Sequence, residues 1–213
     1  MLTLICNSFL AYDQAVLQLN EKEYDYDKDN FFVYDIALIR IDSQFKAVHA
    51  GISVCPICLM QKDLPSRTQD ITIVGMGLTE ENKERPSKLQ YANVRQLTAT
   101  QCFQKNYPKK EIPENLSNIE NRGFCVRGEN NEMTCKGDSG SPAVWKNKNG
   151  VEYLIGINFF AGKTRCGRNW MKSQKVLPKK SVKPSRYVTI PGIIFKWIEE
   201  NGGEEMENMI KSC

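Results

Sequence analysis

Long apolar segments are missing from this sequence, and so is a strong excess of charge of one sign. No apolar run approaches the roughly 20 residues that a membrane-spanning helix needs. The net charge of the 213 residues is only +4 and no aromatic-basic repeat is present, so we expect neither a membrane span nor a nucleic-acid partner. Hydrophobic residues make up 41% of the chain, which suits the core of one large or two small domains.

Metal-binding patterns are missing as well. The acidic segment Glu21–Asn30 contains no glycine, whereas a calcium-binding loop needs one for its sharp turn, so we interpret it as a solvated loop. Cys55 and Cys58 form a single CxxC pair, without the further ligands of a zinc site or the βαβ context of a redox site. We therefore expect two structural cysteines, no metal and no cofactor.

The segment Cys135–Pro142 (CKGDSGSP) has the pattern of a catalytic turn. Its glycines free the backbone to bend tightly, which turns Ser139 Oγ outward and directs consecutive N–H groups at one point. A nucleophile beside such donors is the minimum for acyl transfer. An α/β-hydrolase is excluded, because Ser141 replaces the last glycine of its G-x-S-x-G turn and the only histidine, His49, precedes Ser139.

This segment resembles the nucleophile loop of the chymotrypsin/trypsin-like serine proteases, and further motifs agree with it in order and spacing. They are Asp35–Leu38 (DIAL), like the strand with the catalytic aspartate; Pro56–Leu59 (PICL), like the linker between the barrels; and Gly75–Gly77 (GMG), like the GWG turn with Met76 in place of tryptophan. The resemblance runs from about Val16 to Asn201. It implies an all-β, two-barrel chymotrypsin-like fold with a C-terminal helix.

The resemblance also implies the division of the chain. Residues 1–54 are the remnant of an incomplete first barrel, 55–66 the linker, 67–202 the second barrel with the C-terminal helix, and 203–213 a tail. Patterns within these parts predict strands at Gln14–Leu19 (an edge strand), Ile36–Ile41, Ile71–Gly75, Ala92–Leu97 and Glu152–Ala161. A capping box at Thr98–Gln101 predicts a short helix through Phe103. A second helix is expected with Pro191 in its first turn and Gly202 as its C-terminal cap.

The resemblance assigns roles to individual residues. Ser139 would be the nucleophile, the N–H groups of Gly137 and Ser139 would form the oxyanion hole, and Asp35 would orient a histidine. Asp138 would pair with the N-terminal ammonium that activation cleavage releases. The specificity pocket would consist of Met133 at its floor together with Phe160, Ala161 and Ser185. Because Met133 carries no charge, we expect cleavage after uncharged, small or medium apolar residues rather than after lysine or arginine.

Two parts of the catalytic apparatus are not found. No segment resembles the one that carries the family's histidine, and we interpret His49 as a loop histidine outside the cleft. No activation site of the Ile-Val-Gly-Gly type is present, and Met1–Ala11 reads as the remnant of a longer chain rather than as a signal peptide. We therefore expect a truncated endopeptidase that is inactive in this form. The alternative is a protease-like binding or regulatory module without catalysis.

Eight cysteines indicate a disulfide framework from an oxidising compartment. The resemblance implies the pairs Cys102–Cys125 and Cys135–Cys166, and the loss of a third bridge where Ile71 and Trp145 now stand. The pairing of the other cysteines stays open: Cys6, Cys55, Cys58 and Cys213.

The environment and partners of the chain follow from the same reading. Asn115 begins a glycosylation sequon, so we expect a secreted, monomeric glycoprotein made as a zymogen, with a polypeptide substrate or a protease inhibitor as partner. The lysine-rich insertion Gly167–Lys183 is expected to be a solvated loop near the pocket, with attraction of acidic substrates as the alternative.

Overall fold

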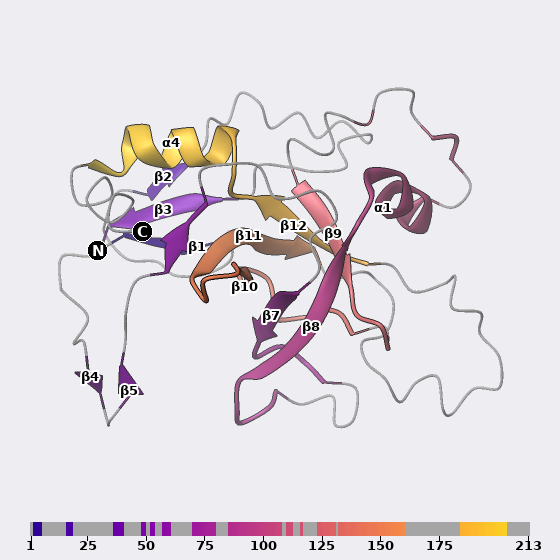
Figure 1. The fold of residues 1–213 in the computed structure, drawn as a ribbon, viewed down its shortest axis with the longest axis horizontal. Coiled ribbons are helices and arrows are strands. Elements are labelled where there is room, and N and C mark those ends of the chain that lie inside the picture. The colour runs from indigo at the N-terminus through magenta and orange to yellow at the C-terminus, as the bar shows by residue number, and fades with distance from the viewer. Residues whose placement is uncertain are drawn as a thin grey trace.

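The computed structural model describes residues 2–5, 16–18, 36–40, 48–49, 52–53, 57–60, 70–79, 85–107, 110–112, 116, 123–130, 132–160 and 184–203. Most of them belong to one seven-stranded sheet in the order β10-β7-β8-β9-β12-β11-β6, in which β10 also pairs with β11. This extra pairing closes all strands except β6 into an antiparallel barrel (Figure 1). The strands of the barrel are β7 (Ile71–Gly75), β8 (Gln90–Leu97), β9 (Gly123–Arg127), β10 (Pro142–Lys146), β11 (Glu152–Phe160) and β12 (Ser185–Thr189).

The barrel strands form where apolar and β-branched residues alternate or run together. In β7, Ile71 and Ile73 are buried while Thr72 between them is half-buried, as the pleat of a strand with one core face requires. The predicted strands at 71–75 and 92–97 are therefore confirmed, the second beginning two residues earlier at Gln90. β11 is confirmed through Phe160, and Ala161 lies outside the described residues.

Trp145 and Ile71 show what replaces the third disulfide of the family. They are direct partners in the register of β10 and β7. Ile71 is fully buried, and Trp145 packs against the same core cluster. An apolar pair thus stands where the family resemblance implied that a bridge is lost.

The N-terminal part forms a smaller sheet. β1 (Leu2–Ile5) and β2 (Val16–Gln18) both pair antiparallel with β3 (Ala37–Arg40), in the order β1-β3-β2. The edge strand predicted within 14–19 is thus confirmed, as is a strand within 36–41. Among the described residues this sheet has three strands and does not close on itself, in contrast to the barrel of the C-terminal part.

Two short elements follow this sheet. β4 (Val48–His49) and β5 (Ile52–Ser53) pair as a hairpin, which extends away from the barrel in Figure 1. His49, expected in a loop, lies instead in the two-residue strand β4, where it pairs with Ile52 of β5. β6 (Cys58–Leu59) then pairs in parallel with β11 and connects the linker to the barrel.

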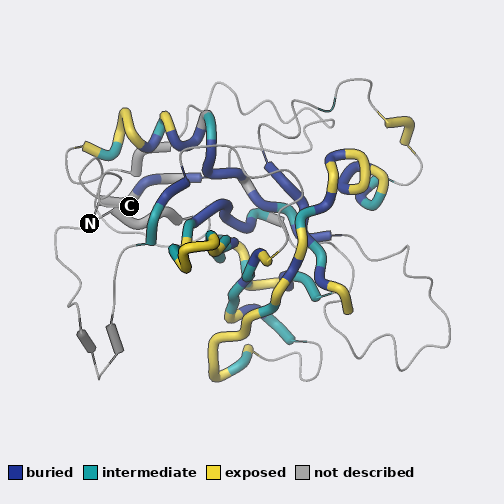
Figure 2. Tube along the Cα trace, in the orientation of Figure 1, coloured by how far each residue is buried: buried dark blue, intermediate teal, exposed yellow. Residues whose placement is uncertain are grey.

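Helix α4 (Ile193–Asn201) joins the two parts of the molecule through one apolar core. Ile194 and Ile198 are buried and Trp197 packs partly against them, which gives the helix one apolar face toward the core. The same cluster contains Ile36 and Leu38 next to and within β3, and Ile157 of β11. Figure 1 shows α4 alongside β2 and β3, and Figure 2 shows its buried side toward them.

The ends of α4 correct one detail of the prediction. Pro191 does not lie in the first turn, because Gly192 is the N-cap residue and Pro191 precedes it. Gly192 has φ +78, a value that glycine adopts readily and that sets the entry of the chain into the helix. Gly202 is the C-cap, as expected. Neither described helix is long and apolar enough to cross a membrane.

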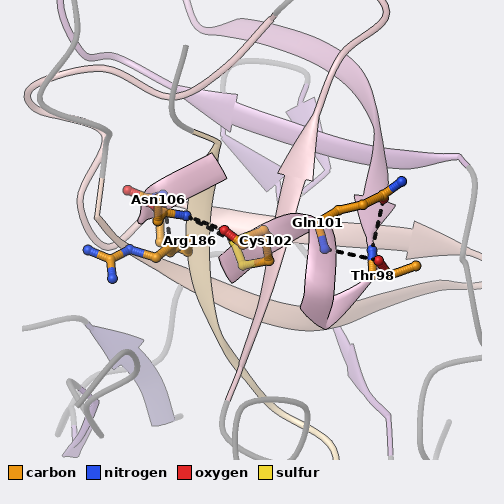
Figure 3. The surroundings of a disulfide bond; sticks show 7 residues. Thr98, Gln101, Cys102, Asn106 and Arg186 are labelled. Carbon is orange, nitrogen blue, oxygen red and sulfur yellow. Dashed lines mark hydrogen bonds between the residues drawn. A yellow bond between two sulfur atoms is a disulfide. The ribbon is translucent and has the colours of Figure 1, made fainter. Parts of the chain in front are cut away.

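Helix α1 (Ala99–Asn106) begins with the predicted capping box. Gln101 N donates to Thr98 Oγ1 at 3.1 Å, and Thr98 N donates to Gln101 Oε1 at 3.2 Å (Figure 3). The helix continues three residues past Phe103, where buried Asn106 donates through Nδ2 to the carbonyl of Cys102 at 2.9 Å. Cys102 is bonded to Cys125 of β9, which confirms that disulfide.

Removal of this disulfide tests its contribution to the fold. The bond joins residues separated by 23 positions, and closing such a loop is worth about 3 kcal/mol in the chain-entropy model. We expect Cys102→Ala with Cys125→Ala to lower the free energy of unfolding by about that amount. The measurement is denaturant unfolding followed by circular dichroism.

The matched control is Thr100→Ala, an exposed position on the same helix, which should change stability by less than about 0.5 kcal/mol. Equal stability of the double variant and the parent chain would contradict a structural role for the bond. Non-reducing peptide mapping of the parent should recover Cys102 linked to Cys125.

Candidate active site

Ser139 is an exposed residue in the second of two consecutive turns, 135–138 and 138–141. Asp138 N donates to Cys135 O at 3.0 Å, and Ser141 N donates to Asp138 O at 3.0 Å. Each turn has a glycine with positive φ at its third position, Gly137 at +98 and Gly140 at +84. A side chain there would be strained, which explains why the loop needs glycine at these two places. The result is an exposed Ser139 on a tightly bent backbone.

The loop is tied to β11 directly after the nucleophile. Gly140 N donates to Asn158 O at 2.7 Å, and Asn158 N donates to Ser141 O at 2.8 Å. This reciprocal pair extends the β10–β11 ladder to the edge of the turn. The position of Ser139 is therefore set by a barrel strand and not by the loop alone.

Asp138 holds the loop from the other side. Its Oδ1 accepts a hydrogen bond from Gly77 N at 2.6 Å, and its Oδ2 accepts one from Cys135 N at 2.7 Å. Hydrogen bonds from N–H groups to a carboxylate are about twice as strong as neutral ones. A third bond, from Leu78 N to Lys136 O at 2.9 Å, joins the same two segments. The nucleophile loop and the Gly75–Gly77 turn are thus one assembly.

The glycines of the GMG turn make room for that carboxylate. A Cβ on Gly77 would lie 2.6 Å from Cγ of Asp138, and a Cβ on Gly75 would collide with the same carboxylate. No methyl group fits at such distances. Met76 between them is 42% exposed, so its side chain is not part of the contact. This geometry explains the two glycines, which the sequence identified only by resemblance.

Three N–H groups of the loop donate to no acceptor among the described residues, those of Lys136, Gly137 and Ser139. The N–H groups of Asp138, Gly140 and Ser141 all donate within the protein. Those of Gly137 and Ser139 donate to no acceptor among the described residues, and both residues are exposed. These two are the donors that the sequence suggested for an oxyanion.

Polar side chains fill the space behind the expected pocket. Thr134 N and Oγ1 each lie 2.8 Å from Ser185 Oγ, with Thr134 as the donor in both contacts, and Asn158 Nδ2 donates to Thr134 Oγ1 at 3.0 Å. All three side chains are buried. Ser185 is thus part of a hydrogen-bonded chain that joins β11, β12 and the segment before the nucleophile. Met133, the expected floor residue, is half-buried next to Thr134.

Tyr187 of β12 completes this polar interior. Burial raises the pKa of its hydroxyl, and the nearby charge of Asp138 raises the pKa further. Ser141 and Asn158 lower the pKa in part, but among the described residues neither makes a well-formed hydrogen bond to the Tyr187 hydroxyl. Tyr187 therefore stays neutral and lies close to both Asp138 and the end of the nucleophile loop.

The sequence missed Thr134, Asn158 and Tyr187 as parts of the site. A signal was present for Asn158, which is a lone polar residue in the apolar run of β11. A polar side chain at a buried position in a strand has to find hydrogen bonds, so it indicates a structured polar contact. Thr134 carried no comparable signal, because its partner Ser185 lies 51 positions away in the sequence.

Several predicted residues lie outside the described part of the chain: Asp35, Asn115, Ala161 and Cys166. Phe160 is described only as the last residue of β11. Cys135 and Cys58 are both disulfide-bonded, so the proposed Cys135–Cys166 pair stays a prediction and Cys58 is not a free thiol. Within the described residues, no group of histidine, cysteine and acidic side chains could hold a metal ion.

Comparison with known proteins places this geometry in a family. The family model Trypsin matches residues 11–176, which is more than half of the chain. The chain therefore belongs to the trypsin-like serine protease family. A solved structure of neuropsin, a serine protease expressed in the limbic system of mouse brain, shares the fold with a TM-score of 0.59 and 24% identity, over 87% of this chain and 69% of that one.

Curated relatives match a similar region. Venom serine protease 34 of Apis mellifera is 30% identical over 144 residues, which are 67% of this chain and 32% of that protein. CLIP domain-containing serine protease B14 of Anopheles gambiae is 33% identical over 149 residues, which are 64% of this chain and 37% of that protein. The chain thus matches about a third of the length of these relatives.

Substitution of Gly77 tests the link between the GMG turn and Asp138. We expect Gly77→Ala to displace the carboxylate from its two N–H donors and to lower the free energy of unfolding by about 2 kcal/mol, the range for hydrogen bonds to a charged group. Thermal unfolding measures this loss. Met76→Ala is the matched control, since its side chain is exposed within the same turn. Equal effects of the two variants would show that the carboxylate contact is unimportant.

Proposed function

We propose that this chain is the major part of a serine endopeptidase domain that acts through an acyl-enzyme at Ser139. The supporting observation is the pair of available N–H groups at Gly137 and Ser139 on a loop that Asp138 fixes from behind. Donors held in place before the reaction stabilise the oxyanion of the tetrahedral intermediate without further rearrangement. Relatives that are named serine proteases support the same assignment.

This chain supplies the proposed nucleophile, the oxyanion donors and the aspartate of the reaction, but not the histidine that acts as the base. Ser139 Oγ attacks the peptide carbonyl, and the developing oxyanion accepts hydrogen bonds from Gly137 N and Ser139 N. A histidine oriented by Asp35 takes the serine proton and gives it to the leaving amine, and water later releases the acyl group. We interpret His49 as lying outside the cleft, because the β4–β5 hairpin that carries it extends away from the barrel in Figure 1.

The setting of the domain follows from its cysteines. Four cysteines of the described residues are disulfide-bonded: Cys58, Cys102, Cys125 and Cys135. Such density is typical of oxidising compartments, so we propose a secreted, monomeric domain made as a zymogen and glycosylated at Asn115. Its partners would be polypeptide substrates and protease inhibitors.

The absent base leads to a prediction about activity. The chain as it stands should hydrolyse peptides at no useful rate, because a serine without a base retains only the roughly 10³–10⁴-fold effect of binding and the oxyanion hole. A chain extended by a family segment with the histidine and the activation site should hydrolyse peptides and react with a fluorophosphonate probe. Ser139→Ala should abolish both, and Asp35→Asn should damage hydrolysis severely.

His49→Ala is the control in the extended chain and should leave hydrolysis unchanged. Activity of the present chain that disappears with His49→Ala would show that His49 is the base after all. An extended chain that folds but never reacts with the probe would favour the binding module without catalysis.

Substrate preference gives a further prediction. Met133 carries no carboxylate, and Ser185 and Thr134 are engaged with each other, so a lysine or arginine of the substrate would be buried without a counter-charge at a cost of several kcal/mol. We expect the extended chain, which carries the histidine and the activation site, to cut a peptide library after uncharged, small or medium apolar residues. Met133→Asp should shift the preference toward arginine and lysine, whereas Met76→Asp, at an exposed methionine, should not. A profile of the extended chain dominated by arginine or lysine would contradict this pocket.

A further inference from the structure

A cation lies beside the proposed oxyanion site. A Cβ built on Gly137 would be 3.7 Å from Nη2 and 3.8 Å from Nε of Arg85, so the guanidinium packs next to the backbone of Gly137. Arg85 is exposed. No ion pair or hydrogen bond engages its side chain in the described part of the chain. The guanidinium is therefore available to a ligand that crosses this loop.

The position of Arg85 relative to Ser139 defines which part of a substrate it meets. Thr134, at the start of the loop, bonds to Ser185 on the pocket side. Gly137, three residues further along the loop, lies against Gly77 and Arg85. A peptide whose residue before the cut entered the pocket, and whose carbonyl reached Gly137 N, would bring the residues after the cut toward Arg85.

A second cationic residue belongs to the same turn. Lys136 is exposed and is fixed to the same turn, because its carbonyl accepts from Leu78 N at 2.9 Å. An acidic side chain is the group that complements this surface.

We propose that Arg85 selects peptides with an aspartate or glutamate on the leaving-group side of the cut bond. This rests on the proposed endopeptidase function, because that function defines the direction of the peptide. The planar guanidinium binds a carboxylate through two parallel hydrogen bonds, which an amide of the same shape cannot match in charge. Since Arg85 is exposed, the preference should be modest, about fivefold.

Binding of a matched peptide pair to the full 213-residue chain tests this proposal without requiring hydrolysis. The peptides carry the same small apolar residue before the cut and differ only in glutamate or glutamine after it. Titration calorimetry at low salt should give about fivefold tighter binding of the glutamate peptide. The difference should shrink at high ionic strength, since exposed charges are screened.

Variants identify the residue responsible. Arg85→Gln should make the two peptides bind equally, and Arg85→Glu should favour a third peptide with lysine at the same position. Arg95→Gln is the matched control, because Arg95 is an exposed arginine on β8 and not part of the described loop. It should keep the preference for glutamate.

The outcomes separate this proposal from the catalytic one. Equal binding of the two peptides to the parent chain, or binding of neither, overturns the role of Arg85, whatever the probe shows at Ser139. A glutamate preference that Arg95→Gln removes and Arg85→Gln preserves also overturns it. A preference that depends on Arg85 in a chain whose Ser139 never reacts, even when extended, supports the acidic subsite and overturns the endopeptidase.

Discussion

The carboxylate of Asp138 is the fixed point of the active-site loop. It accepts one N–H from the loop itself, at Cys135, and one from the turn after β7, at Gly77. These bonds connect two segments that are 61 positions apart in the sequence. The glycines of the GMG turn leave the space that the carboxylate occupies. The N–H groups of Gly137 and Ser139, on either side of Asp138 in the sequence, donate to no acceptor among the described residues.

The barrel makes that assembly rigid. β11 bonds to the loop at Asn158, packs its apolar side chains against α4 and β3, and presents Asn158 to Thr134. One strand therefore contributes to the nucleophile loop, to the polar wall behind the pocket and to the contact with the N-terminal sheet. β11 pairs with β10, β12 and β6. A substitution that displaces β11 should therefore alter the structure at all three places.

Local patterns predicted much of the fold. The capping box at Thr98 and Gln101 placed the start of α1 correctly, because both bonds lie within four consecutive residues. The helix nevertheless runs past Phe103, since its last turn is stabilised by burial of Asn106 and by the disulfide to β9. Pro191 misled the prediction for α4, because the positive φ of Gly192 sets the helix start and no local pattern reveals that angle. The family resemblance correctly gave the Cys102–Cys125 bond, while composition left all pairings open.

The sequence by itself determined the chemical identity of the loop: the serine, its flanking glycines, the neighbouring aspartate and the uncharged Met133 are local facts that one octapeptide and the residues before it contain. Only the tertiary structure decided which groups meet that loop. Gly77, Asn158, Ser185 and Arg85 reach it from distant strands and turns, and no pattern along the chain encodes those distances. The reason is physical: turns depend on neighbouring residues, whereas a carboxylate cradle, a polar pocket wall and an exposed cation beside Gly137 depend on barrel closure.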